Sequence, residues 1–78
     1  MKPVALVTGG SRGIGLAIAK QLCEAGYDMA INGMRSADKV QDIVEELSST
    51  GTKVIYCQGD IGSTQDRAGI LDQIRSSF

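Results

Sequence analysis

The sequence contains no histidine and no tryptophan, and it has only one phenylalanine, two tyrosines and two cysteines. Without histidine, neither a Ser-His-Asp triad nor a zinc site can be built from these residues alone. Cys23 and Cys57 form no C-x-x-C pair, and each lies in an apolar stretch. We therefore expect both cysteines to be buried and reduced in the core of a cytoplasmic protein.

Charge and hydropathy disfavour two further classes of partner. The net charge is −1, and acidic and basic residues are interleaved, so no basic stripe is present to follow a nucleic-acid backbone. No apolar run approaches the roughly 20 residues that span a bilayer, and the amino terminus lacks the apolar segment of a signal peptide. We therefore expect a soluble protein without a nucleic-acid or membrane partner.

Short apolar runs alternate with amphipathic segments along the whole chain. The runs have the composition of strands buried in a parallel sheet, and they lie at residues 4–8, 29–31 and 54–57. Gly26 and Gly51 are placed to end two helices, and Ser63 with Asp66 is placed to begin a third. The pattern predicts an α/β fold of order β-α-β-α-β-α, the first half of a doubly wound Rossmann sheet with partial strand order 3-2-1.

Helical spacing also predicts which helix faces are buried. In the first helix, large apolar residues recur every four positions, at Ile14, Ile18 and Leu22, and the same broad side is filled by Ala17, Ala19 and Cys23. Ser36 is placed to cap the second helix, whose apolar positions follow the i, i+3, i+4, i+7 pattern at Val40, Ile43, Val44 and Leu47. We expect each of these sets to face the sheet.

A glycine-rich turn, Thr8-Gly9-Gly10-Ser11-Arg12-Gly13-Ile14-Gly15, directly follows the first strand and opens the first helix. Gly9 suits a tight turn, Gly13 allows the main chain to approach a pyrophosphate, and Gly15 allows close packing of helix on sheet. The N–H groups at the start of that helix would face the phosphates. A purely structural turn is the alternative, but strand, motif and helix together favour a dinucleotide site.

The end of the second strand indicates which dinucleotide is bound. NAD sites place an acid about 20 residues past the glycines, whereas NADP sites lack it and have a cation nearby. The chain reads Asn32-Gly33-Met34-Arg35-Ser36, with no carboxylate before Asp38. Arg35 and Arg12 can each hold a phosphate by paired hydrogen bonds, although either can instead be a solvated loop charge. We therefore expect NADP as the cofactor.

The pattern T-G-x-x-x-G-x-G resembles that of the short-chain dehydrogenase/reductase family, and the resemblance extends from Val4 to Phe78. It is most similar to the bacterial 3-oxoacyl-(acyl-carrier-protein) reductase group. The resemblance implies an NADP-dependent oxidoreductase of a small carbonyl or alcohol substrate, acting as a homo-oligomer. It also implies that Asp60 binds the adenine amino group, although Asp60 can also be an ordinary turn residue. The cofactor contacts that we expect are Gly9, Ser11, Arg12, Gly13, Ile14, Gly15, Arg35, Asp60 and Ile61.

The Tyr-x-x-x-Lys pair on which the chemistry of that family rests has no counterpart in this sequence. Tyr27 is followed four residues later by Ile31, and Tyr56 by Asp60. We therefore expect residues 1–78 to form a partial dinucleotide-binding domain that lacks the catalytic half and is inactive by itself. The alternatives are a non-catalytic nucleotide-binding module and an inactive truncated product.

Overall fold

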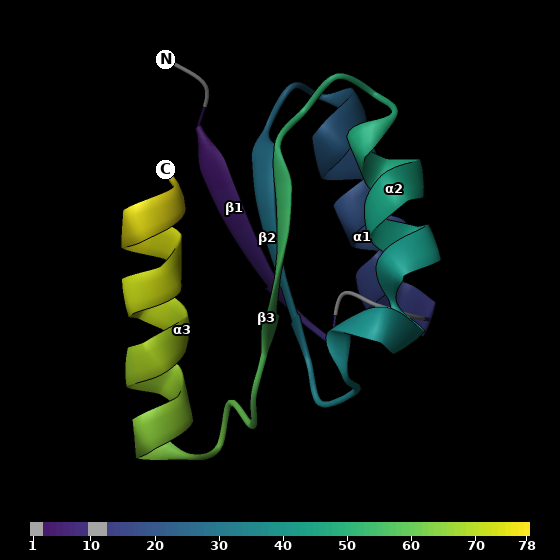
Figure 1. The fold of residues 1–78 in the computed structure, drawn as a ribbon. Helices are drawn as coiled ribbons and strands as arrows, with labels where there is room; N and C mark the ends of the chain where they lie inside the picture. The colour runs from purple at the N-terminus through teal and green to yellow at the C-terminus, as the bar shows by residue number, and fades with distance from the viewer. Residues whose placement is uncertain (1–2, 10–12) are drawn as a thin grey trace.

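The computed structural model describes residues 3–9 and 13–78 (Figure 1). The elements follow the order strand β1 (Val4–Thr8), helix α1 (Gly13–Glu24), strand β2 (Asp28–Gly33), 3-10 helix η1 (Ala37–Lys39), helix α2 (Gln41–Ser48), strand β3 (Val54–Gln58) and helix α3 (Thr64–Ser77). The three strands are parallel and lie in the order β1-β2-β3. The expected alternation and the half-Rossmann sheet are thus confirmed.

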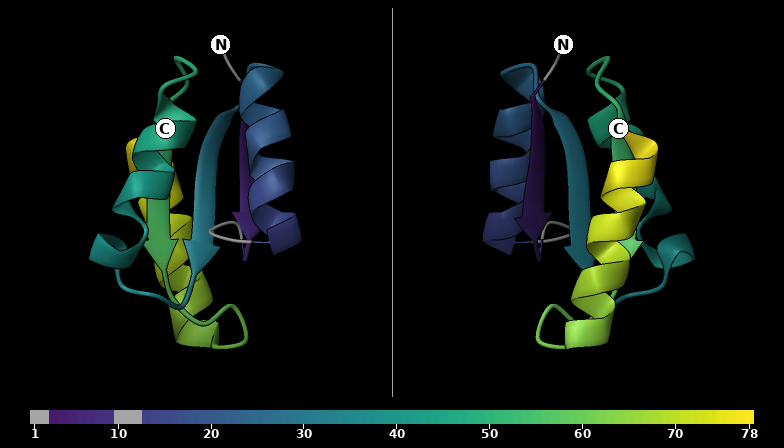
Figure 2. Two further views of the ribbon diagram at one scale, coloured as in Figure 1. Left: turned by 90° about the vertical axis from the view of Figure 1, so that its right-hand side faces the viewer. Right: turned by 90° about the vertical axis from the view of Figure 1, so that its left-hand side faces the viewer.

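Helices cover both faces of the sheet, with α1 and α2 on one face and α3 on the other (Figures 1 and 2). Successive residues of a strand point to opposite faces, so β2 directs Met29 and Ile31 to one core and Ala30 to the other. The buried residues of the first core are Val7, Ala19, Cys23, Met29, Ile31 and Leu47. Those of the second core are Ala30, Cys57 and Ile70. Both cysteines are buried and unpaired, as expected.

Helix α1 presents only part of its expected apolar side to the sheet. Ala19 and Cys23 are buried, whereas Ile14 is 81% exposed and Ile18 is 48% exposed. Leu16 and Leu22 are partly buried against the same core, so the inward face is formed by these residues with Ala19 and Cys23. The expected end of the helix is confirmed, because Gly26 has a φ of 98° and closes the last turn.

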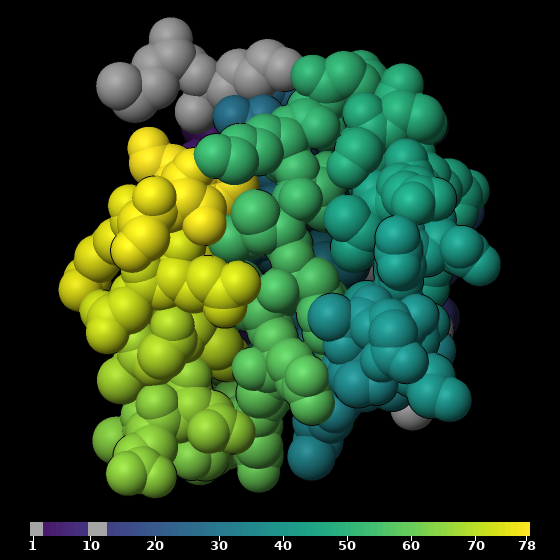
Figure 3. All heavy atoms as spheres, viewed as in Figure 1, coloured from purple at the N-terminus to yellow at the C-terminus, as the bar shows by residue number. Residues whose placement is uncertain are grey.

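Strand β1 is buried less completely than an apolar parallel strand would suggest. Val7 lies in the first core, but Val4 and Leu6 on the other face are each 40% exposed. The position of helix α3 accounts for this difference. Its Ile70 packs on Ala30 and Cys57, and the helix does not cover β1 (Figure 2, right). Strand β3 forms the other edge of the sheet and is visible between α3 and α2 in Figure 3.

Helix α2 begins later than the sequence indicates. The Ser36 hydroxyl hydrogen-bonds to the Asp38 carboxylate at 2.5 Å instead of capping a main-chain N–H, and the chain first forms η1. The helix starts at Gln41, with Val40 at the N-cap position. Its apolar face is as expected, with Val40 and Leu47 buried and Ile43 and Val44 partly buried. No helix in the described part of the chain is long and apolar enough to cross a membrane.

Candidate functional site

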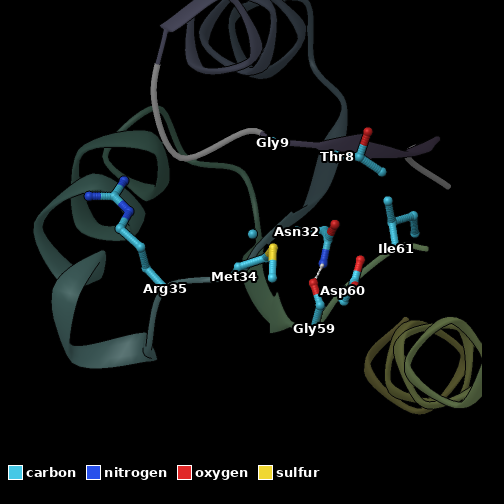
Figure 4. A pocket seen from close by; sticks show the side chains of 9 residues that line it. Thr8, Gly9, Asn32, Met34, Arg35, Gly59, Asp60 and Ile61 are labelled. Atoms are coloured by element: carbon cyan, nitrogen blue, oxygen red, sulfur yellow. Dashed lines mark hydrogen bonds between the residues drawn. The ribbon is translucent and has the colours of Figure 1, made fainter. Parts of the chain in front are cut away.

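The carboxyl ends of the three strands lie together at one end of the sheet. They surround a hollow of about 380 Å³ (Figure 4). In a parallel α/β sheet, ligands bind at the carboxyl end of the strands. The hollow is lined by Thr8, Gly9, Asn32, Gly33, Met34, Arg35, Gly59, Asp60 and Ile61. The fold therefore brings together Gly9, Arg35, Asp60 and Ile61, four of the residues expected from the sequence to contact a cofactor.

The glycine turn has the conformation that a close approach of main chain to ligand requires. Gly9 and Gly13 have φ values of 67° and 62°, in the left-handed region that favours glycine. A Cβ atom built on either residue would meet no atom of the described residues within 4 Å. Helix α1 starts at Gly13, and its first N–H groups lie at this same end of the sheet. These features fit the pyrophosphate of a dinucleotide.

The other expected contacts in the turn are placed only in part. Ser11 and Arg12 lie outside the described residues, as does Gly10. Ile14 stands at the start of α1 with an exposed side chain, and Gly15 is half-buried in the first helical turn.

Asn32, a residue that the sequence analysis did not single out, organises the centre of the hollow. It is only 3% exposed, and its Nδ2 donates to the main-chain oxygens of Cys57 at 2.9 Å and Gly59 at 3.0 Å (Figure 4). These bonds hold the exit of β3, which carries Asp60, against the end of β2. An amide at the end of an otherwise apolar strand is the signal that could have identified it, since a buried amide needs partners.

Asp60 is held by the turn that follows β3. Its Oδ1 accepts a hydrogen bond from the Gly62 N–H at 2.9 Å, and its own N–H donates to Asp66 Oδ2 at 2.8 Å. The Asp66 N–H in turn donates to Ser63 Oγ at 3.3 Å, which confirms the expected cap of α3. Within the described residues, Oδ2 of Asp60 has no protein partner, so one carboxylate oxygen can accept a hydrogen bond from a ligand.

Arg35 lies on the opposite side of the hollow from Asp60, and its side chain points away from Asn32 and Met34 (Figure 4). Its main-chain oxygen accepts a hydrogen bond from the Tyr56 hydroxyl at 2.5 Å. Burial raises the pKa of the Tyr56 phenol, and the nearby charge of Arg35 partly opposes this rise. The hydroxyl therefore stays protonated and able to donate at neutral pH.

The described lining of the hollow combines charged and apolar side chains. Among the residues that the structure describes, one carboxylate and one guanidinium line it, and neither a tyrosine nor a lysine does. Two large apolar residues on its rim are exposed, Met34 at 72% and Ile61 at 40%. No cluster of potential metal ligands occurs among the residues that the structure describes. The described lining can thus bind an apolar ring through Met34 and Ile61 and an anion through Arg35.

Comparison with known proteins points to one family. The family model of short chain dehydrogenase matches residues 3–78. A 3-oxoacyl-(acyl-carrier-protein) reductase of Staphylococcus epidermidis is 38% identical over 78 residues, which are 100% of this chain and 32% of that protein. A versicolorin reductase 1 of Dothistroma septosporum is 39% identical over 75 residues, which cover 96% of this chain and 28% of that protein. The chain thus spans about a third of the length of the curated relatives it matches.

Solved structures agree with the sequence relatives. A 3-oxoacyl-(acyl-carrier-protein) reductase from Brucella melitensis in complex with NAD superposes with a TM-score of 0.91 at 36% identity, over 100% of this chain and 30% of that one. An L-sorbose reductase from Gluconobacter frateurii, complexed with NADPH and L-sorbose, gives a TM-score of 0.90 at 29% identity, over 99% of this chain and 29% of that one. This chain belongs to the short-chain dehydrogenase/reductase family.

Proposed function

We propose that this chain is the NADP-binding part of an oxidoreductase that reduces a carbonyl or oxidises an alcohol. The observation that carries the proposal is the charge arrangement around the hollow. Strand β2 ends in Asn32 and Gly33 without a carboxylate, and Arg35 follows at the rim. A carboxylate at this place would hydrogen-bond the ribose 2′-hydroxyl of NAD and repel a 2′-phosphate, whereas a guanidinium attracts that phosphate.

Each part of the nucleotide has a matching feature in the chain. The open main chain at Gly9 and Gly13, together with the start of α1, suits the pyrophosphate. The unpartnered oxygen of Asp60 suits the adenine amino group, and the exposed side chains of Met34 and Ile61 suit the faces of the base. Arg35 then suits the 2′-phosphate, with Arg12, Ser11, Ile14 and Gly15 of the glycine turn as further contacts. The bound cofactor would supply or accept a hydride, and the chain's own role is to hold and orient it.

The names of the relatives and the ligands of the solved structures support this proposal. The two curated relatives are named as reductases, and the two structures hold NAD and NADPH. Because this chain spans about a third of their length, the substrate is proposed only as a small carbonyl compound or alcohol. We further propose that the enzyme is a homo-oligomer and acts in the cytoplasm. Its proton-transfer groups would lie outside residues 1–78.

The proposal is tested by titrating the chain with 2′,5′-ADP and with 5′-AMP in a calorimeter. The two ligands differ only in the 2′-phosphate, so their affinity ratio isolates that group. A charge-assisted contact is worth about 1.5–3 kcal/mol, so we expect 2′,5′-ADP to bind about ten- to a hundredfold more tightly. Equal affinities would contradict NADP preference while leaving a dinucleotide site in place. Absence of binding by both ligands would contradict the site itself.

A further inference from the structure

Tyr56 and Arg35 are joined across the strand pair at the end of the sheet where the hollow lies. Tyr56 belongs to β3, whereas Arg35 follows the end of β2. The Tyr56 hydroxyl donates to the main-chain oxygen of Arg35 at 2.5 Å. A side chain of one strand therefore holds the exit segment of the neighbouring strand at the residue that we assign to the 2′-phosphate.

The rest of the Tyr56 side chain is fixed by packing. Tyr56 is half-buried against the core between the sheet and the helices α1 and α2. It stands opposite Ile31 in the register of the two strands, so its backbone is part of the β2–β3 ladder. An aromatic ring has few rotatable bonds, and a packed ring therefore places its hydroxyl rigidly.

The segment from Gly33 to Ser36, which contains Arg35, is also held by a main-chain hydrogen bond at each end. The Gly33 oxygen accepts from the Gly59 N–H at 3.0 Å, and the Ser36 oxygen accepts from the Lys39 N–H at 3.0 Å. The Tyr56 bond lies between these two main-chain bonds, at the point where the chain passes the rim of the hollow. It thus restricts the main-chain conformation from which the Arg35 side chain projects.

We infer that Tyr56 is a positioning residue for 2′-phosphate recognition, acting through the main chain of Arg35. This inference rests on the proposed function. Removing the hydroxyl leaves the guanidinium present but allows its backbone to move, so binding of the 2′-phosphate weakens. The adenine contact at Asp60 lies across the hollow and is held by other hydrogen bonds, so it is unaffected. A single hydrogen bond contributes about 0.5–1.5 kcal/mol, so we expect a loss of about three- to tenfold for the 2′-phosphate.

The experiment compares the parent chain with Tyr56→Phe, using titrations with 2′,5′-ADP and 5′-AMP. We expect Tyr56→Phe to bind 2′,5′-ADP about three- to tenfold more weakly and to bind 5′-AMP as the parent does. Tyr27→Phe is the matched control, because Tyr27 precedes the amino end of β2, away from the hollow, and its variant should leave both affinities unchanged. A partly unfolded variant lowers both apparent affinities by the same factor, so the ratio of the two remains informative.

A double-mutant cycle with Arg35→Ala separates a positioning role from a merely structural one. In the Arg35→Ala background, we expect Tyr56→Phe to leave the affinity for 2′,5′-ADP unchanged, because the group that it positions is absent. An unchanged ratio for Tyr56→Phe in the parent, or an equal loss of affinity with and without Arg35, would overturn the inference while the proposed function stands. If the parent itself binds 2′,5′-ADP no better than 5′-AMP, both the NADP assignment and the role of Tyr56 are wrong.

Discussion

Asn32 and Gly59 lie side by side at the carboxyl ends of neighbouring strands, and Nδ2 of Asn32 donates to the Gly59 oxygen at 3.0 Å. The same amide donates to the Cys57 oxygen at 2.9 Å, so one buried side chain binds two carbonyls of the β3 exit. Tyr56 makes the reverse connection, from β3 to the exit of β2. The two segments that border the hollow are thus each held by a side chain from the other strand.

We expect Asn32→Asp to destabilise the chain by about 2–3 kcal/mol at neutral pH, measured by urea unfolding. A carboxylate has nearly the same shape but cannot donate, and it would face the oxygens of Cys57 and Gly59. Its pKa in the folded chain should be raised, so the loss should shrink as the pH falls and the group becomes protonated. Gln21→Glu on the exposed side of α1 adds the same charge and should change stability little. An equal effect at the two positions would count against a structural role for Asn32.

The two carboxylate oxygens of Asp60 have different roles. One accepts a hydrogen bond within the turn, and the other is assigned to the adenine amino group. Asp60→Asn keeps an oxygen to accept from the Gly62 N–H but presents an amide instead of the second oxygen. We expect it to weaken binding of NADP and NAD by a similar factor, about five- to tenfold, because both carry adenine. Asp72→Asn, an exposed change on α3, is the control. Undiminished binding by Asp60→Asn would show that Asp60 only shapes the turn.

Arg35 should control the choice between the two cofactors. We expect Arg35→Asp to weaken NADP binding about ten- to a hundredfold and to leave NAD binding unchanged or improved, because a carboxylate then faces the 2′-position. Fluorescence titration with NADPH and NADH measures both affinities. Arg75→Asp on the exposed surface of α3 makes the same charge change and should leave the ratio as it is. A parallel loss for both cofactors would mean that Arg35 supports the fold rather than the phosphate.

Self-association is the expected behaviour of this chain in solution. Among the described strands β1 pairs only with β2, and its residues Val4 and Leu6 are each 40% exposed. An apolar edge of this kind can pair with another chain. Sedimentation equilibrium at micromolar concentration should therefore show species larger than the monomer, and Leu6→Lys should reduce them. Met34→Lys alters an apolar residue that is exposed elsewhere, and it should not. A parent chain that remains monomeric under these conditions would argue against the edge as a contact surface.

Local features of the sequence were enough to predict the order of the strands and main helices and the parallel half-sheet. The alternation of apolar runs and helical periodicity indicated the parallel half-sheet, and the glycine-rich turn indicated the family. Gly26 and Ser63 marked a helix end and a helix start that the structure confirms, because caps and stop signals act within a few residues. Gly9 and Asp60 were both among the expected cofactor contacts, and the structure brings them together at one hollow.

Only the tertiary structure decided which surfaces are covered and how the site is held. Of the apolar side expected for α1, Ala19 and Cys23 are buried, whereas Ile14 and Ile18 are exposed, because the fit of a helix to a sheet depends on the distance between them. The exposure of Val4 and Leu6 on β1 depends on the strands against which α3 packs. The bonds from Asn32 to Gly59 and from Tyr56 to Arg35 join residues on different strands, so no local pattern in the sequence reports them.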